Sequence, residues 1–205
     1  MHGAHAGQKC EREENGVRRS IVLVGLMGAG KTSVGRRLSE LLNVPFFDSD
    51  SEIEAASAGM RIPEIFERFG EDEFRRLERE VLRRLLAGPP AVIATGGGAF
   101  MQDDTREAIA QTGLSVWLKV ELETLMARVV GRSGRPLLDV DDPQAALAAL
   151  HDARAPIYGL ADLTIAAGER QTQDDVARKV IAAVKARDAS VEAGTTGVLD
   201  IGEAR

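Results

Sequence analysis

An eight-residue stretch near the N-terminus has the most specific chemistry in this chain of 205 residues. Gly25-Leu-Met-Gly-Ala-Gly-Lys-Thr32 matches G-x-x-x-x-G-K-[ST] at every fixed position, the pattern of a loop that wraps phosphates. An apolar, β-branched run (21–24) precedes it, and a segment with apolar residues at helical spacing (33–42) follows it. Strand, glycine loop and helix in this order predict a nucleoside triphosphate site. The alternative is a glycine turn that binds no ligand.

Each residue type in this loop has a physical reason. Glycines let backbone N–H groups turn inward, and the N-terminus of the following helix adds partial positive charge behind them. Lys31 can reach the β- and γ-phosphates, and the Thr32 hydroxyl can ligate Mg²⁺. The residues predicted to bind the triphosphate are Gly28, Ala29, Gly30, Lys31, Thr32 and Ser33.

Two acids, Asp48 and Asp50, follow the next apolar segment. In an extended segment, residues two apart point the same way, so both carboxylates can face one cleft. One would hold Mg²⁺ through water, and the other would accept a hydrogen bond from the group that is phosphorylated. The alternative is a polar strand end in which Ser49 or Asp50 caps the next helix.

A glycine triplet, Gly96-Gly97-Gly98, follows a third apolar segment. Without side chains, the backbone N–H groups there can approach a ligand closely. A tight turn without a ligand is the alternative. If the sheet is parallel, this triplet lies opposite the phosphate loop, which favours a role in binding.

Arginines form the third group of candidate residues. Arg75 and Glu78 are three residues apart on a predicted helix and share a face. They could form a solvated ion pair, or Glu78 could orient Arg75 to bind a substrate carboxylate in bidentate fashion. Arg154 ends a later helix and could point into the same cleft.

The stretch Arg132-Ser-Gly-Arg135-Pro-Leu-Leu-Asp139 is polar, contains glycine and is flanked by helices. This composition suits a mobile lid over about residues 131–142 that carries arginines onto the phosphates. A closing arginine would stabilise charge on the transferred group and exclude water. A plain surface loop is the alternative.

Strand-like and helix-like segments alternate along the chain and would position these groups. Strands are predicted at 20–24, 44–48, 91–95, 115–119 and 163–166, and helices at 31–42, 51–58, 63–69, 73–86, 104–111, 122–130, 143–153 and 173–187. Such alternation predicts an α/β fold with three layers, α/β/α, around a five-stranded parallel sheet. Ligands of such sheets bind at the carboxyl ends of the strands, where all the candidate loops fall.

Composition limits the classes of function. Hydrophobic residues make up 44% and charged residues 28%, as in an ordinary globular protein. No apolar run is long enough to span a membrane, and the net charge of −6 argues against nucleic-acid binding. The single cysteine, Cys10, cannot form an internal disulfide and favours a reducing, cytoplasmic setting.

Three regions are predicted. Residues 1–18 form a flexible polar leader, residues 19–187 a single domain that includes the lid, and residues 188–205 a flexible tail. The leader has no apolar segment typical of a secretory signal. Its His2, His5 and Cys10 have a spacing that matches no standard metal site.

Taken together, the motifs resemble those of the shikimate kinase family, small P-loop kinases of the nucleoside-monophosphate-kinase fold. The resemblance covers about residues 19–185. Each matched segment is short, and the specificity comes from finding all of them in the same order along the chain. The matched segments are the phosphate loop (25–32), Phe-Phe-Asp-Ser-Asp (46–50), Phe-Arg-Arg-Leu-Glu (74–78), Gly-Gly-Gly (96–98), Arg-Pro-Leu-Leu (135–138) and Arg-Ala-Pro-Ile-Tyr (154–158).

The resemblance implies transfer of the ATP γ-phosphoryl group to the 3-hydroxyl of shikimate, a step of aromatic amino-acid biosynthesis through chorismate. It implies that Asp48 serves Mg²⁺ through water and that Lys31, Asp50 and Arg135 are the catalytic residues. Shikimate would be held by Asp50, Arg75, Gly97, Gly98 and Arg154. Adenine would rest between a lid-side arginine, for which Arg132 is the nearest match, and a turn that contains Arg170 and Gln171. A monomer is expected.

Three other functions share part of this pattern. A gluconate or nucleotide kinase of the same fold is the nearest, but a nucleotide acceptor would not need two arginines beside a glycine triplet and an acidic pair. A GTP-dependent switch protein would need an Asn-Lys-x-Asp segment, which this sequence lacks. A non-catalytic ATP-binding module is disfavoured by the intact set of Lys31, Thr32, Asp50 and Arg135.

Overall fold

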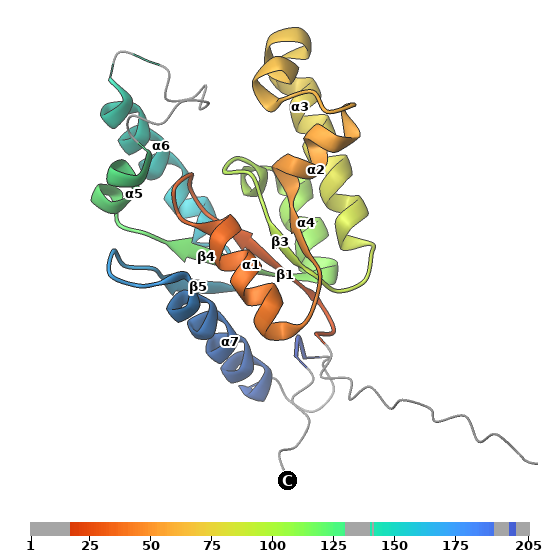
Figure 1. The fold of residues 1–205 in the computed structure, drawn as a ribbon, viewed down its shortest axis with the longest axis vertical. Helices are drawn as coiled ribbons and strands as arrows, with labels where there is room; N and C mark the ends of the chain where they lie inside the picture. The colour runs from red at the N-terminus through yellow and green to blue at the C-terminus, as the bar shows by residue number, and fades with distance from the viewer. Residues whose placement is uncertain (1–16, 130–139, 141, 191–196, 200–205) are drawn as a thin grey trace, which may run out of the picture.

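The computed structural model describes residues 17–129, 140, 142–190 and 197–199. Its centre is a five-stranded sheet in the order β2-β3-β1-β4-β5, with every neighbouring pair parallel (Figure 1). The strands are β1 (Ser20–Val24), β2 (Phe46–Asp48), β3 (Val92–Ala94), β4 (Gly113–Lys119) and β5 (Leu163–Ala166). The predicted α/β class with a five-stranded parallel sheet is confirmed.

Helices cover both faces of the sheet, as is typical of an all-parallel sheet whose strands are joined by helical crossovers. α1 and α7 lie side by side on one face, and α3 packs beside α4 on the other (Figure 1). The helices are α1 (Lys31–Leu42), α2 (Ser49–Ala56), α3 (Ile62–Leu86), α4 (Asp103–Thr112), α5 (Leu122–Val129), α6 (Pro143–Tyr158) and α7 (Gln173–Ser190), and a 3₁₀ turn, η1, spans Ala99–Met101.

The central strands explain why the apolar runs are nearly continuous rather than alternating. All five residues of β1 and all three of β3 are buried, because helices cover both sides of a parallel sheet. The core extends from these strands to apolar faces of the helices, such as Leu38 on α1 and Leu82 on α3. This rigid centre places the carboxyl ends of β1, β2 and β3 at one edge.

The acidic pair differs from the prediction. β2 ends at Asp48 and α2 begins at Ser49, so Asp50 lies in the first turn of a helix and not in an extended segment. The Asp48 carboxylate caps this helix, accepting from the backbone N–H groups of Asp50 (3.1 Å) and Ser51 (3.4 Å). The shared-direction argument for the two acids was therefore wrong, and it is Asp48 that caps the helix.

Two helices also differ from their predicted bounds. The predicted break between residues 69 and 73 is present as a kink in α3, where Gly70 has φ 80° and ψ 176°. α6 continues past Pro156 to Tyr158, although the sequence pattern predicted an end at 153. Burial of Tyr158 offsets the cost of the proline, because tertiary packing outweighs local propensity.

The chain ends are only partly described. Val17 forms an antiparallel bridge with Leu199, and the Arg18 N–H donates to the Val198 carbonyl (2.8 Å). The Asp188 carboxylate accepts from the N–H groups of Val198 and Leu199, both at 2.8 Å. Residues 17–18, 188 and 198–199, which belong to the segments expected to be flexible, thus contact one another. His2, His5 and Cys10 lie outside the described residues.

Within the described ranges, no helix combines the length and apolar character needed to cross a membrane.

Candidate active site

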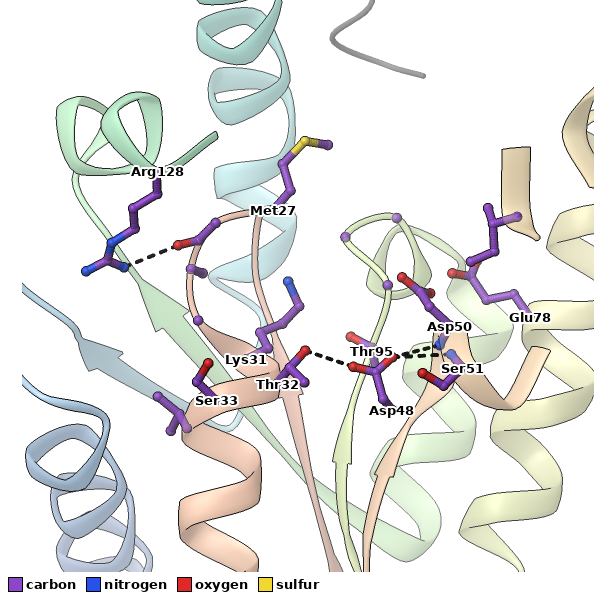
Figure 2. Close-up of a pocket in the computed structure, with 18 of the residues that line it drawn as sticks. Met27, Lys31, Thr32, Ser33, Asp48, Asp50, Ser51, Glu78, Thr95 and Arg128 are labelled. Atoms are coloured by element: carbon purple, nitrogen blue, oxygen red, sulfur yellow. Dashed lines mark hydrogen bonds between the residues drawn. The ribbon is translucent and has the colours of Figure 1, made fainter. Parts of the chain in front are cut away.

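The phosphate loop connects β1 to α1 in a conformation that needs its glycines. Gly25, Gly28 and Gly30 have φ values of 137°, 81° and 89°, a region that side chains rarely adopt. A Cβ at Gly28 would also lie 2.7 Å from Cγ1 of Val129. The loop therefore holds its backbone in a fixed curve over the N-terminus of α1 (Figure 2).

Lys31 and Thr32 begin α1 and face this loop. The Lys31 ammonium donates to the carbonyl oxygens of Gly25 (2.8 Å) and Leu26 (3.0 Å), and the residue is 9% exposed. The Thr32 hydroxyl donates to the Asp48 carboxylate at 2.8 Å, which joins the loop to the end of β2 (Figure 2). A lysine, a hydroxyl and a carboxylate thus meet at one side of the cleft.

The half-buried Asp50 and the fully buried Glu78 bring two carboxylates to the other side, pointing toward one another (Figure 2). Asp50 Oδ1 and Glu78 Oε1 are buried and have no partner within the part of the chain that the structure describes. A Cβ at Gly96 would lie 2.7 Å from the first and 2.9 Å from the second. Both oxygens therefore crowd one point next to the glycine triplet, where a ligand's hydroxyls could satisfy them.

Burial raises the pKa of the Asp50 carboxyl above its usual value, and the negative charge of Asp48 adds to this effect. Lys31 and Arg75 act in the opposite direction with smaller effects. Burial also raises the pKa of Glu78, against the opposing effect of Arg75. Strongly perturbed carboxyls in a cleft are typical of functional sites.

Arg75 is held by two acids and points at the triplet. Its guanidinium donates to Glu78 Oε2 (2.7 Å) and Glu71 Oε1 (3.0 Å), and its side chain is 15% exposed. Glu78 is fully buried, so the alternative of a solvated Arg75–Glu78 pair was wrong. A Cβ at Gly98 would lie 2.6 and 2.7 Å from the two terminal nitrogens of Arg75. Only glycine lets this cation lie against the loop.

The last turns of α6 reach the same loop from another direction. Arg154 donates to the Gly97 carbonyl (3.1 Å), and the Tyr158 hydroxyl donates to the same oxygen. The Tyr158 ring stacks on Trp117 of β4, with centroids 5.8 Å apart. Two arginines from distant segments thus converge on the glycine triplet, as the arginine hypothesis required.

A single cavity of about 1130 Å³ joins these groups. The predicted residues that line it are Gly28, Ala29, Gly30, Lys31, Thr32, Ser33, Asp48, Asp50, Arg75, Gly97, Gly98, Arg154 and Gln171. Arg170 does not line it and is exposed, because the turn after β5 directs the neighbouring Gln171 inward instead. Arg132, Arg135 and nearly all of the predicted lid lie outside the described residues.

Sequence reasoning missed some residues of the cavity. Arg128 lines it and donates to the Gly28 carbonyl at 3.2 Å, at the edge of the phosphate loop (Figure 2). Its place in the last turn of α5, just before the predicted lid, was the signal that could have identified it. Phe66 and Phe74 also line the cavity and form an aromatic wall, with ring centroids 4.5 Å apart.

Comparison with known proteins agrees with this geometry. A family model described as shikimate kinase matches residues 27–185. The chain is 54% identical over 165 residues to a shikimate kinase of Mesorhizobium japonicum, covering 80% of this chain and 78% of that one. It is 50% identical to a shikimate kinase of Ruegeria pomeroyi, covering 82% of this chain and 86% of that protein.

A solved structure extends the likeness to three dimensions. The shikimate kinase of Acinetobacter baumannii in complex with shikimate superposes with a TM-score of 0.78. It is 41% identical in sequence, over 82% of this chain and 94% of that one. The fold, the arrangement of the cleft and these likenesses agree, and this chain belongs to the shikimate kinase family.

Proposed function

We propose that this protein transfers the γ-phosphoryl group of ATP to the 3-hydroxyl of shikimate, forming shikimate 3-phosphate and ADP. One observation carries the proposal. A phosphate loop and a set of buried acids and arginines line the two ends of one continuous cavity. The first end suits a triphosphate, and the second suits a small acid that carries several hydroxyls.

The nucleotide end is supported by the loop geometry. Backbone N–H groups of residues 28–33 bind the phosphates, and the Lys31 ammonium leaves the Gly25 and Leu26 carbonyls to neutralise the transferred group. Arg128 supplies a further positive charge beside Gly28, and Gln171 lies on the adenine side. By the family resemblance, Arg135 would assist Lys31 in neutralising the transferred group, and Arg132 would contact the adenine.

Mg²⁺ fits the residues at the junction of α1 and β2. The Thr32 hydroxyl and the Asp48 carboxylate are oxygen donors 2.8 Å apart, the ligand type that this ion prefers. Among the residues described, no three acids, histidines or cysteines gather as a closed metal site. Thr32 would bind the ion directly and Asp48 through water, and the ion would offset phosphate charge.

The acceptor end is supported by the buried charges. Arg75 and Arg154 bind the shikimate carboxylate, and the Gly97–Gly98 backbone lies beside it. Asp50 accepts a hydrogen bond from the attacking hydroxyl. Burial raises the pKa of Asp50, which makes it a better proton acceptor than an exposed aspartate.

The reaction is an in-line displacement. The bond from the 3-oxygen to the γ-phosphorus forms as the bond from that phosphorus to the ADP oxygen breaks, and the hydroxyl proton passes to Asp50. Lys31 and Arg135 neutralise the charge on the transferred group, and the residues of the acceptor end orient the hydroxyl. Since the transition state is loose, orientation and charge neutralisation contribute more than proton removal.

We also propose a monomeric cytoplasmic enzyme that uses ATP and shikimate and binds neither nucleic acid nor membrane. The net charge of −6 and the single cysteine support this setting.

A coupled assay of ADP release tests the activity. The protein is supplied with ATP and Mg²⁺, and with shikimate, gluconate or a nucleoside monophosphate as the acceptor. Rapid ADP release with shikimate, at least a hundredfold above the other acceptors, is the expected result. If ADP release with gluconate is as fast as with shikimate or faster, shikimate is not the preferred substrate. If no acceptor gives ADP release, the proposed kinase activity is wrong.

A further inference from the structure

Tyr158 is buried beneath the glycine triplet but does not belong to the cavity lining. It is the last residue of α6 and is 2% exposed. Its ring stacks on Trp117 with an interplanar angle of 27°, and its hydroxyl donates to the Gly97 carbonyl. A buried phenol hydroxyl needs a hydrogen-bond partner, and here that partner is a backbone carbonyl of the glycine triplet.

The Gly97 carbonyl is held twice. Arg154 Nη1 donates to it at 3.1 Å, one helical turn before Tyr158 on the same face of α6. Burial raises the pKa of Tyr158 to about 12, against the opposing effect of Arg154, so the hydroxyl remains protonated and able to donate throughout the neutral range. Two donors from one rigid helix fix the direction of this carbonyl.

The direction of a carbonyl determines that of the next N–H group. The peptide bond is planar and trans, so the Gly97 C=O and the Gly98 N–H point in opposite directions within the peptide plane. Among the residues that the structure describes, the Gly98 N–H has no acceptor. It is therefore available to a ligand once the Gly97 carbonyl is turned toward α6.

The guanidinium of Arg75 lies against this same residue. A Cβ at Gly98 would lie 2.6 Å from Nη1 of Arg75, so the cation and the Gly98 backbone are in close contact. A backbone N–H beside a guanidinium is a suitable pair of donors for one anionic oxygen group. The two donors come from distant parts of the chain, so their alignment depends on what holds the loop.

We propose that Tyr158 is a positioning residue whose hydroxyl holds the Gly97–Gly98 peptide so that the Gly98 N–H, together with Arg75, donates to the substrate carboxylate. This inference rests on the proposed function, since it names how one group of shikimate is recognised. Tyr158 acts through the peptide and does not touch the substrate.

The test is Tyr158→Phe, which removes the hydroxyl and leaves the ring to stack on Trp117. The expected result is a three- to tenfold rise in the KM and Kd for shikimate, with the KM for ATP changed less than twofold. Ser115→Ala is the matched control, because its buried hydroxyl donates to Asp162 (2.7 Å) and neither residue lines the cavity. It should lower Tm to a similar extent and leave both KM values unchanged.

The methyl ester of shikimate identifies the group involved. If the hydroxyl acts through the carboxylate, Tyr158→Phe weakens binding of the acid more than binding of the ester. In the unmodified protein, shikimate should also move the Gly98 amide proton resonance downfield, and this shift should shrink in Tyr158→Phe.

Several outcomes overturn the inference. It is wrong if Tyr158→Phe binds shikimate as tightly as the unmodified protein does. It is also wrong if the substitution weakens binding of the acid and of the ester equally, or if the KM values for shikimate and ATP rise together. In each of these cases normal phosphorylation of shikimate by the unmodified protein would leave the proposed function intact. If the unmodified protein does not bind shikimate at all, the proposed function fails, and this inference fails with it.

Discussion

Individual side chains in the cleft are arranged at a cost to stability. Asp50 and Glu78 each leave a buried carboxylate oxygen without a partner among the described residues, and burial raises the pKa of both groups. Such groups weaken folding, because their charge is favoured more in the unfolded chain than in the folded one. Under the proposed function, a substrate's hydroxyls would pair with these oxygens, so function and stability would be opposed at these positions.

Asp50→Asn should separate the two effects. Turnover with shikimate should fall at least a hundredfold, because the acceptor of the hydroxyl proton is lost, while ATP binding stays nearly unchanged. The variant should also be more stable at pH 7, by about 1 kcal/mol or roughly 2–4 °C in Tm. Steady-state kinetics and thermal unfolding measure the two effects, and a Tm below that of the unmodified protein would contradict the stability argument.

The pH dependence of this stability difference follows from the sign of the shift. The folded-state pKa of Asp50 is raised above its ordinary value of 3.8, so the folded protein binds the proton more tightly than the unfolded chain. The unmodified protein regains stability as pH falls through that raised pKa. The advantage of Asp50→Asn should therefore shrink on acidification and vanish near the ordinary value. An advantage that grows at low pH would show that another group dominates.

Gly98→Ala tests the contact between the triplet and Arg75. The new methyl group would push the guanidinium away from Gly98 and strain its bond to the buried Glu78, so some loss of stability should accompany the loss of binding. A lost charge-assisted hydrogen bond costs about 1.5–3 kcal/mol, so shikimate should bind roughly ten- to a hundredfold more weakly.

Gly97→Ala is the comparison, measured by titration calorimetry under the same conditions. Its methyl group would meet its nearest atoms at 3.6 and 3.7 Å, which is ordinary contact, and its effect should be much smaller. If the two variants lose the same affinity for shikimate, the contact between Gly98 and Arg75 does not determine how tightly shikimate binds.

Helix and strand ends determine how these side chains are presented. β2 stops at Asp48 because its carboxylate caps α2, and this same carboxylate accepts a hydrogen bond from Thr32 on α1. α3 bends at Gly70, and α6 extends to Tyr158. Each of these local features brings a polar group to the carboxyl edge of the sheet, which is where a parallel sheet can bind ligands.

Asp48 therefore has two roles that two variants can separate. Asparagine is as good a helix cap as aspartate, so Asp48→Asn should leave Tm nearly unchanged but raise the Mg²⁺ concentration needed for half-maximal activity several-fold. Asp48→Ala removes the cap as well and should destabilise the protein by about 0.5–2 kcal/mol. Identical Mg²⁺ requirements of Asp48→Asn and the unmodified protein would exclude Asp48 from metal binding.

At the level of the whole molecule, described residues near the two termini make contacts outside the segment that matches the family model. That match ends at residue 185, whereas Asp188 on α7 binds the backbone of Val198 and Leu199, and Leu199 bridges to Val17. Val198 is fully buried. This closure lies at the amino end of β1, away from the cavity, so it should serve stability rather than catalysis.

Asp188→Ala should accordingly lower the free energy of unfolding by about 1–3 kcal/mol, because two backbone N–H groups lose a charged acceptor. Urea denaturation measures the loss, and kcat and KM should remain within twofold of the unmodified values. Glu107→Ala, an exposed acid on α4, removes the same charge and should change stability by less than 0.5 kcal/mol. A loss of the same size in both variants would assign the effect to net charge.

Local patterns in the sequence determined the fold class, the phosphate loop and the order of the candidate motifs. They did so because glycine spacing, apolar periodicity and strand–helix alternation reflect short-range physics of the backbone. The break at Gly70 was predicted for the same reason. By contrast, the end of α6, the exclusion of Arg170 and the role of Arg128 were not predicted, since each depends on contacts with distant segments.

Only the tertiary structure decided which charges are buried and which groups meet. Glu78 becomes a fully buried partner of Arg75 because α3 packs against the loop after β3, and Asp48 becomes a cap because β2 ends there. The pairing of Tyr158 with Gly97 joins residues 61 positions apart. Burial and long-range contact are properties of the packed chain, and no short pattern of residues contains them.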